Sequence, residues 1–241
     1  MTDADTDAPA LLVDGLRFRW REDLAPVLDI QALRIAAGER VFLAGPSGSG
    51  KSTLLSLVAG VMLPSSGSLE VLGQSMASLN GPGRDRFRAD YLGVIFQQFN
   101  LLPWLPVLDN VLLPCRFSRR RRARAVEMDG SMQAQALRLL GRLGLDAQTL
   151  LQRPVNELSV GQQQRVAAAR ALIGAPQLVI ADEPTSALDT DLRQEFVDLL
   201  SEQCQSTGAA LLFVSHDLAL APLFQRQLSL PALNRPGQEV A

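Results

Sequence analysis

One nine-residue stretch constrains the fold of this chain more than any other feature. It reads Gly45, Pro46, Ser47, Gly48, Ser49, Gly50, Lys51, Ser52 and Thr53, and it fits the pattern G-x-x-x-x-G-K-[ST]. The apolar residues 40–44 before it predict a short strand, and residues 52–60 after it predict a buried helix. Strand, glycine-rich loop and helix in this order indicate an α/β fold with a phosphate-binding loop.

The composition of this phosphate loop suits a nucleoside triphosphate. Its glycines let successive backbone N–H groups point inward, and the following helix adds the positive end of its dipole. Lys51 can reach the β- and γ-phosphates, and the hydroxyl of Ser52 can bind Mg²⁺. We therefore expect a nucleotide and Mg²⁺ to bind here.

Two carboxylates follow a second apolar strand, predicted at residues 178–181. α/β sheets bind ligands at the carboxyl ends of their strands, which is where Asp182 and Glu183 would lie. Asp182 fits a Mg²⁺ ligand, and Glu183 fits a base that orients or polarises an attacking water. The alternative for these two residues is a solvated acidic turn.

The chain contains a single histidine, His216, just after another predicted strand at 209–214. This position puts His216 on the same sheet edge as Glu183, from which it could contact the γ-phosphate. A structural or merely surface histidine is the alternative.

The remaining periodicity predicts alternating strands and helices. Strands are expected at 68–72 and 92–97, antiparallel strands within 11–36, and helices at 130–144, 162–173 and 192–203. The interval 100–114 contains Pro103, Pro106 and Pro114, which predicts short helices and turns. The alternation indicates a mostly parallel sheet covered on both faces, interrupted by a helical insertion at about residues 98–160.

Bulk properties exclude several classes of protein. With 241 residues and 47% hydrophobic residues, we expect one large domain or one domain with an inserted subdomain. The formal net charge of −2 disfavours nucleic acid as a partner. Neither a secretory signal nor an apolar stretch long enough to span a bilayer is visible, so we expect a soluble, cytoplasmic chain. Cys115 and Cys204 are expected to be free thiols.

A further motif, Leu158-Ser159-Val160-Gly161-Gln162, lies well downstream of the phosphate loop. With the motifs above, it resembles the ATP-binding cassette (ABC) family over about residues 11–230. The resemblance implies ATP as the nucleotide and hydrolysis coupled to transport, with Lys51, Gln97, Glu183 and His216 as the catalytic residues. Gln97 would also bind the nucleotide and Mg²⁺ beside Ser52 and Asp182. Trp20 matches the position of an aromatic residue that stacks on adenine; a core aromatic is its alternative.

The family resemblance also implies that one copy of the chain holds only half of a site. In that family, Ser159, Gly161 and Gln162 of one subunit close the nucleotide site of another, and Asp189 matches a loop that crosses between the two subunits. Val160 departs from the family pattern, which has glycine there. The branched side chain of valine restricts the backbone there. An altered rate of ATP turnover therefore stays an open alternative.

The resemblance implies a single ABC ATPase domain over residues 1–241, with a P-loop NTPase core and an N-terminal antiparallel β subdomain. The expected divisions are a RecA-like core with the β subdomain at 10–97 and 161–232, a helical subdomain at 98–160, and flexible ends at 1–9 and 233–241.

Residues 96–111 look like the lipoprotein-releasing and macrolide-exporter group of that family. This resemblance implies a peripheral position on the cytoplasmic face of the inner membrane. The implied partners are a permease with a large extracytoplasmic domain, a second copy of the chain and a periplasmic adaptor. Three alternatives stay open: a non-transporting cassette of the cell-division type, an importer ATPase, and a soluble regulator of ribosomes or DNA.

An arginine cluster lies in the predicted insertion. Its members are Arg116, Arg119, Arg120, Arg121, Arg122 and Arg124. A solvated helix start is one reading of the cluster, and contact with acidic lipid headgroups or with a permease element is the other.

Overall fold

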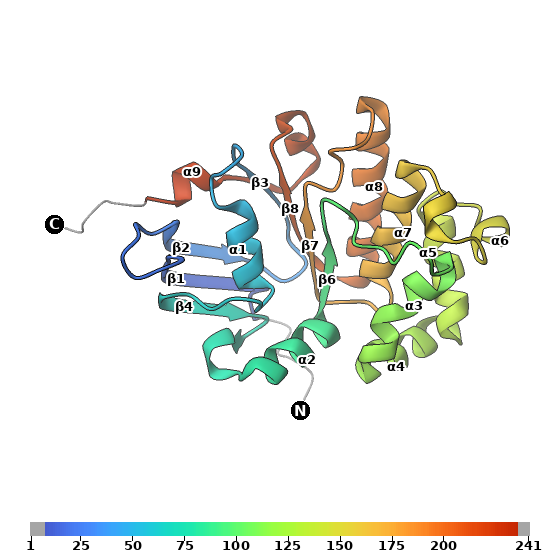
Figure 1. The fold of residues 1–241 in the computed structure, drawn as a ribbon, viewed down its shortest axis with the longest axis horizontal. Coiled ribbons are helices and arrows are strands. Elements are labelled where there is room, and N and C mark those ends of the chain that lie inside the picture. The colour runs from blue at the N-terminus through green and yellow to red at the C-terminus, as the bar shows by residue number, and fades with distance from the viewer. Residues whose placement is uncertain (1–7, 236–241) are drawn as a thin grey trace.

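Two β-sheets with different hydrogen-bonding patterns organise the chain, as the computed structural model shows for residues 8–235, the side chains of residues 147, 148 and 191 excepted (Figure 1). The antiparallel sheet has the order β2-β1-β4-β5, with β1 at Leu11–Phe18, β2 at Leu28–Ile35, β4 at Ser66–Val71 and β5 at Gln74–Ser75. The parallel sheet has the order β6-β7-β8-β3-β9, with β6 at Leu92–Ile95, β7 at Leu178–Asp182, β8 at Ala210–Ser215, β3 at Arg40–Ala44 and β9 at Arg226–Ser229. The predicted antiparallel strands and mostly parallel sheet are confirmed.

The parallel sheet is buried on both faces, because its strands alternate between two hydrophobic cores. On β3, Val41 and Leu43 pack with the antiparallel sheet and with helix α1, Lys51–Val58. Phe42 faces the opposite core, where its ring stacks on Phe213 of β8 with centroids 6.1 Å apart. Continuous apolar runs such as residues 178–181 are typical of such doubly covered strands.

Helices cover the second face of the parallel sheet and extend beyond its β6 edge (Figure 1). They are α3 at Val107–Phe117, α4 at Arg119–Asp129, α5 at Met132–Arg142, α6 at Ala147–Leu150, α7 at Val160–Leu172 and α8 at Thr190–Thr207. Helix α2 at Gly81–Tyr91, the short α9 at Leu230–Leu233 and 3₁₀ turns at 76–78, 155–157 and 218–223 complete the described elements. The stretch 98–160 is helical throughout its regular structure, and we propose it as one subdomain.

Helix α3 corrects the prediction of short helices and turns over 100–114. It is one continuous helix that runs through Pro114, although proline removes a main-chain hydrogen bond. Val107, Val111 and Cys115, spaced four residues apart, are buried against α5 and α7. Packing of this stripe outweighs the local cost of the proline.

The structure separates the members of the arginine cluster from one another. Arg121 is buried and donates to the main-chain carbonyls of Ile173, Leu92 and Ala171. Arg120 lies over the ring of Tyr91 at 4.7 Å, and Arg116 forms an ion pair with Asp109 at 2.5 Å. Arg122 donates to the carbonyl of Cys115 at 3.2 Å, so four of the six arginines have partners within the fold.

Arg121 in particular is held as a buried cation. Burial lowers its pKa to about 10. Its carbonyl partners include those of Ala171 and Ile173 at the end of α7, where the helix dipole favours a positive charge.

The expected flexible ends lie mostly outside the described residues, and the structure describes only residues 233–235 of the C-terminal one. Asn234 Oδ1 accepts from the backbone of Asp29 at 2.6 Å, and its Nδ2 donates to the carbonyl of Val27 at 2.9 Å. The backbone of Arg235 donates to the carbonyl of Asp29. Asn234 and Arg235 are therefore hydrogen-bonded to the start of β2 and the residue before it.

Candidate functional site

A cavity of about 520 Å³ opens at the carboxyl ends of β3, β6, β7 and β8, and we call it the strand-edge cavity. Its lining consists of Trp20, Val27, Pro46, Ser47, Gly48, Gly50, Lys51, Ser52, Thr53, Gln97, Asp182, Glu183 and His216. Four loops that are far apart in sequence meet there because parallel strands end at the same edge. Of these residues, only Val27 was not singled out from the sequence.

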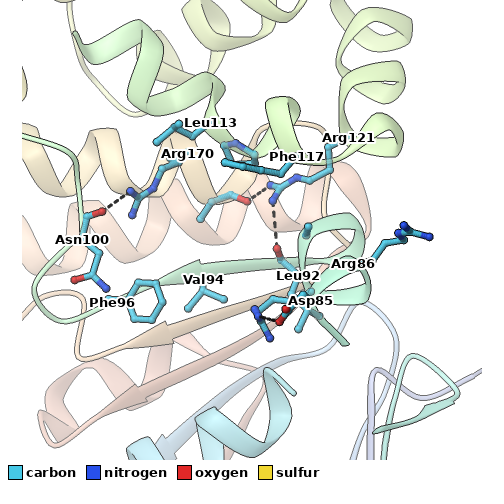
Figure 2. A pocket seen from close by; sticks show the side chains of 14 residues that line it. Asp85, Arg86, Leu92, Val94, Phe96, Asn100, Leu113, Phe117, Arg121 and Arg170 are labelled. Atoms are coloured by element: carbon cyan, nitrogen blue, oxygen red, sulfur yellow. Dashed lines mark hydrogen bonds and ion pairs between the residues drawn. The ribbon is translucent and has the colours of Figure 1, made fainter. Parts of the chain in front are cut away.

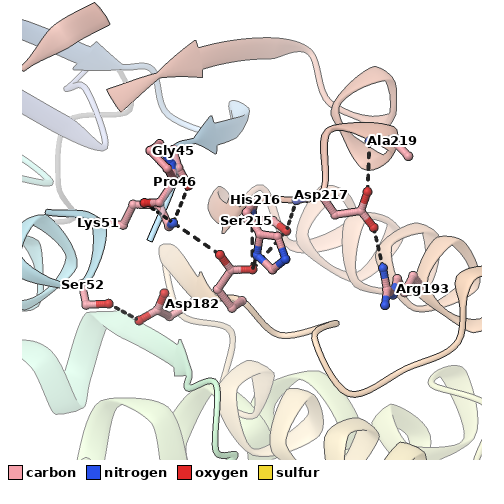
Figure 3. Close-up of polar contacts among 11 residues, drawn as sticks. Gly45, Pro46, Lys51, Ser52, Asp182, Arg193, Ser215, His216, Asp217 and Ala219 are labelled. Atoms are coloured by element: carbon pink, nitrogen blue, oxygen red, sulfur yellow. Dashed lines mark hydrogen bonds and ion pairs between the residues drawn. The ribbon is translucent and has the colours of Figure 1, made fainter. Parts of the chain in front are cut away.

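The phosphate loop is shaped by two close approaches. A side chain at Gly45 would lie 2.7 Å from the hydroxyl of Ser49, which is buried without a hydrogen-bond partner. Lys51 Nζ donates to the carbonyls of Gly45 and Pro46, the latter at 3.1 Å (Figure 3). These two contacts fix the ammonium group beside the loop, where Lys51 lines the cavity.

The first turn of α1 supplies free donors to the strand-edge cavity. Gly50 caps this helix at φ +97°, a conformation that favours glycine, and no side chain caps the helix. The backbone N–H groups of the first turn therefore have no partner inside the helix. Such a turn fits an anionic group.

Ser52 and Asp182 form a hydrogen-bonded pair of oxygen-bearing side chains on one side of the cavity. The Ser52 hydroxyl donates to Asp182 Oδ2 at 3.1 Å (Figure 3). Burial raises the pKa of Asp182, and the neighbouring Glu183 adds to this effect. A cation at this place would stabilise the charged carboxylate, and hard oxygen donors suit Mg²⁺. Gln97 lines the same cavity from the loop after β6.

Glu183 holds a strained position at the centre of the site. Its backbone has φ +46°, which is unusual for a residue other than glycine. Its Oε2 accepts from the Ser215 hydroxyl at 3.2 Å and lies 2.9 Å from Nδ1 of His216, while Oε1 lies 3.5 Å from Lys51 Nζ. Strain of this kind clusters at functional sites, since the surrounding contacts must hold it.

Ser215 and Asp217 are positioning groups that sequence reasoning did not single out. The buried Ser215 hydroxyl also accepts from the backbone of Asp217 at 3.1 Å. Arg193 of α8 donates to Asp217 Oδ2 at 2.7 Å and lowers the pKa of that carboxyl (Figure 3). These contacts fix the turn that carries His216. Their sequence signal was only their adjacency to the histidine.

Trp20 lies in the loop after β1 rather than in the core. Its side chain is 59% exposed and packs edge-on against Phe18, with ring centroids 5.2 Å apart. Phe18, two residues earlier on the strand, is buried. The exposed face of Trp20 at the rim of the cavity suits stacking on a flat aromatic group.

The residues predicted to complete the site lie elsewhere on the molecule. Ser159 begins α7 with a capping box, accepting from the backbone of Gln162 at 3.3 Å while Gln162 Oε1 accepts from the backbone of Ser159 at 3.0 Å. Ser159, Gly161 and Gln162 line a separate cavity of about 460 Å³, beside Glu195 of α8. Asp189, at the start of α8, lines neither cavity. Within one copy, the structure does not bring these residues to the phosphate loop.

Comparison with known proteins supports these observations. Residues 28–186 match the family model described as ABC transporter. The chain is 43% identical over 205 residues to the lipoprotein-releasing system ATP-binding protein LolD of Hydrogenovibrio crunogenus, covering 85% of each chain. It is 38% identical over 209 residues to the macrolide export ATP-binding/permease protein MacB of Photorhabdus laumondii, covering 87% of this chain and 31% of that one.

The chain is also similar to solved structures of ABC transporter cassettes. The dimeric structure of MJ0796, a bacterial ABC transporter cassette, superposes with a TM-score of 0.80 at 31% identity, covering 96% of this chain and 99% of that one. The dimeric post-hydrolysis state of MJ0796 bound to ADP and Pi gives a TM-score of 0.79, also at 31% identity and with the same coverage. No helix in residues 8–235 has the length and apolarity needed to cross a membrane.

Proposed function

Because this chain belongs to the ABC transporter family, we propose that it is the ATP-binding and ATP-hydrolysing subunit of a complex in which a membrane permease exports or extracts a substrate. The observation that carries the proposal is the strand-edge cavity, which gathers a phosphate loop, a glutamine, two carboxylates and a histidine from four separate loops. The similarity to lipoprotein-releasing and macrolide-export subunits favours extraction or export over import.

Most residues of the cavity have a proposed role in binding the nucleotide. The N–H groups of the phosphate loop and Lys51 bind the phosphates, and Trp20 stacks on adenine. Ser52, Asp182 and Gln97 hold Mg²⁺, which when bound would neutralise charge on the β- and γ-phosphate oxygens. The raised pKa of Asp182 supports this assignment, since a carboxylate destabilised by burial gains from a neighbouring cation.

Hydrolysis requires Glu183 to exchange its partners. Its carboxylate is shared among Lys51, Ser215 and His216. When Lys51 binds the γ-phosphate, its ion pair with Glu183 is replaced. Glu183 Oε1 is then free to accept a proton from the attacking water. Ser215 and His216 continue to orient the carboxylate, and the Nε2 side of the exposed His216 ring is free to contact the γ-phosphate.

Two copies of the chain form the working unit in this proposal. The free N–H groups at the start of α7 and the Ser159 hydroxyl would face the γ-phosphate bound to the other copy. Ser159 and Gly161 line a cavity away from their own phosphate loop, which supports an intermolecular role. A two-fold axis would then create two equivalent sites.

The decisive experiment mixes two inactive variants. Lys51→Ala removes the phosphate-binding side of the site, and Ser159→Arg blocks the closing side. If sites are shared between copies, a mixture of the two variants has partial activity, because a mixed dimer contains one intact site. Self-contained sites predict that Ser159→Arg subunits keep full ATPase activity by themselves, and that result would overturn the shared-site proposal.

A groove beside β6 is the place where we propose that the permease docks. It has a volume of about 600 Å³ and runs between α2, the loop after β6 and helices α3 and α4 (Figure 2). Apolar residues such as Leu113 and the strongly exposed Phe117 line it together with several arginines. An amphipathic segment with acidic side chains would complement this lining.

The finer features of the partner are also proposals. By analogy with the proteins named lipoprotein-releasing and macrolide-export, the permease would have a large extracytoplasmic domain, and a periplasmic adaptor would join the complex. The chain would then sit at the cytoplasmic face of the membrane. Purification of the complex from membranes, followed by identification of the co-eluting permease, tests these points. A partner of the cell-division type would instead assign the chain to mechanical work without transport.

A further inference from the structure

One loop separates the strand-edge cavity from the groove beside β6. It comprises residues 96–100, between β6 and α3. Gln97 lines the strand-edge cavity, whereas Phe96 and Asn100 line the groove. A shift of this loop therefore changes both places at once.

The loop has an unusual backbone. Phe99 and Asn100 are consecutive residues with φ values of +58° and +50°. Asparagine tolerates this left-handed conformation, but phenylalanine rarely adopts it. The N–H of Phe99 donates to the carbonyl of Phe96 at 3.0 Å, and that of Asn100 donates to the carbonyl of Gln98 at 2.6 Å. A turn of this kind persists only where neighbouring groups hold it.

Arg170 of α7 is the neighbour that holds the turn. Its Nη1 donates to the carbonyl of Asn100 at 2.6 Å (Figure 2), and its Nη2 donates to the carbonyl of Phe99 at 2.5 Å. Within residues 8–235, Arg170 forms no ion pair with a carboxylate. Burial lowers the pKa of Arg170. A planar guanidinium bonds the two adjacent carbonyls through two different nitrogens in a fixed fork, whereas a lysine would offer a single nitrogen on a flexible stem.

The same helix carries the residues proposed to close the site of a second copy. Ser159 and Gln162 form the capping box in its first turn, and Arg170 lies in its last turn. Because an α-helix of 13 residues is rigid over its length, a movement at one end is transmitted to the other. Arg170 thus joins three features: Gln97, the groove and the start of α7.

We propose that Arg170 is a positioning residue that fixes the 96–100 loop to α7, so that Gln97 and the first turn of α7 move together when the groove is filled. This inference rests on the proposed roles of Gln97 and of the groove. The contacts of Arg170 itself do not depend on those roles, and they can be tested separately.

The first test measures amide hydrogen exchange in the full chain without nucleotide or metal. Arg170→Ala should accelerate exchange over residues 96–101 by at least about tenfold, because the loop loses two charge-assisted hydrogen bonds. Arg84→Ala is a matched control, since Arg84 also donates to two carbonyls, those of Gly60 and Leu79, away from the loop. Unchanged exchange at 96–101 in Arg170→Ala, or an equal acceleration in Arg84→Ala, would overturn the proposal.

The second test asks whether the loop transmits its position to Gln97. In Arg170→Lys, the Mg²⁺ concentration for half-maximal ATP hydrolysis should rise about tenfold, while ATP affinity without metal stays within about twofold. A merely structural role would weaken Mg²⁺ binding and ATP binding alike, and it would also lower the melting temperature. Gln97→Ala is measured in parallel: if it leaves the Mg²⁺ dependence unchanged, the role of Gln97 fails. If Gln97→Ala shifts the Mg²⁺ dependence but Arg170→Lys does not, the positioning role of Arg170 is overturned.

Discussion

Lys51 Nζ lies 3.5 Å from Glu183 Oε1, and both side chains are almost fully buried. The ion pair joins the cation proposed to bind the γ-phosphate to the carboxylate proposed to activate water. It gives each buried charge a partner. A phosphate that bonded Lys51 would release the carboxylate. Nucleotide binding and activation of the base are thereby coupled through one contact.

Glu183→Gln should retain ATP binding and lose ATP hydrolysis. Glutamine preserves the shape and accepts from Ser215, but it cannot take a proton. Loss of a general base lowers turnover by about 10²- to 10⁴-fold. Steady-state phosphate release measures this effect, and light scattering with ATP should show a lasting dimer. Hydrolysis near the wild-type rate would show that Glu183 is not the base.

Asp182→Asn should stabilise the chain in metal-free buffer at neutral pH. Burial raises the pKa of Asp182 in the folded state, so folding favours its protonated form. Below its ordinary pKa of 3.8, the carboxyl is protonated in both states and no penalty exists; the penalty appears as pH rises through 3.8 and is complete above the raised pKa. We expect a gain of about 1 kcal/mol or less, because the group is only partly buried.

Urea denaturation with a chelator at pH 7 and at pH 4 checks this prediction. The gain should shrink at pH 4, and Mg²⁺ should stabilise the wild type but not the variant. A variant that is less stable than the wild type at pH 7 would contradict the assigned cause, since Asp182 would then be stabilised in its charged form.

Val160→Gly should lower the KM for ATP with little change in stability. Val160 is the first residue of α7 and is 49% exposed, and the capping box of Ser159 and Gln162 is complete with valine in place. We expect the free energy of unfolding to change by less than about 1 kcal/mol. Removing the branched side chain opens the free N–H groups to the phosphate of a second copy, which should lower the KM for ATP. An unchanged KM would place Val160 outside the closed interface.

Arg121→Leu should destabilise the chain by roughly 2–4 kcal/mol, because three carbonyls would lose a charged donor in a buried place. Arg119→Leu is the matched control, since Arg119 begins the same helix and is exposed. Its effect should stay within about 0.5 kcal/mol. Chemical denaturation measures both values. Equal changes in the free energy of unfolding would show that the buried contacts of Arg121 do not stabilise the chain.

Local sequence predicted most of the elements that form the strand-edge cavity. The phosphate loop needs its own glycines, and Asp182, Glu183 and His216 directly follow apolar strands whose ends meet at one sheet edge. Contacts with distant residues override or add to what local sequence indicates in two places. Helix α3 continues through Pro114 because its buried stripe contacts α5 and α7, and Asn234 is fixed because it bonds to β2.

The sequence by itself determined that this chain has an α/β fold with a phosphate loop, since the motif and its flanking strand and helix are contiguous. The halves of the proposed shared site could be recognised from short motifs, Gly45–Thr53 and Leu158–Gln162, but only the tertiary structure decided that they line separate cavities of one copy. The tertiary structure also decided which arginines are bonded to main-chain carbonyls. Arg121 and Arg170 differ from their neighbours only through the carbonyls that the fold brings to them, and such contacts between distant residues leave no local signal in the chain.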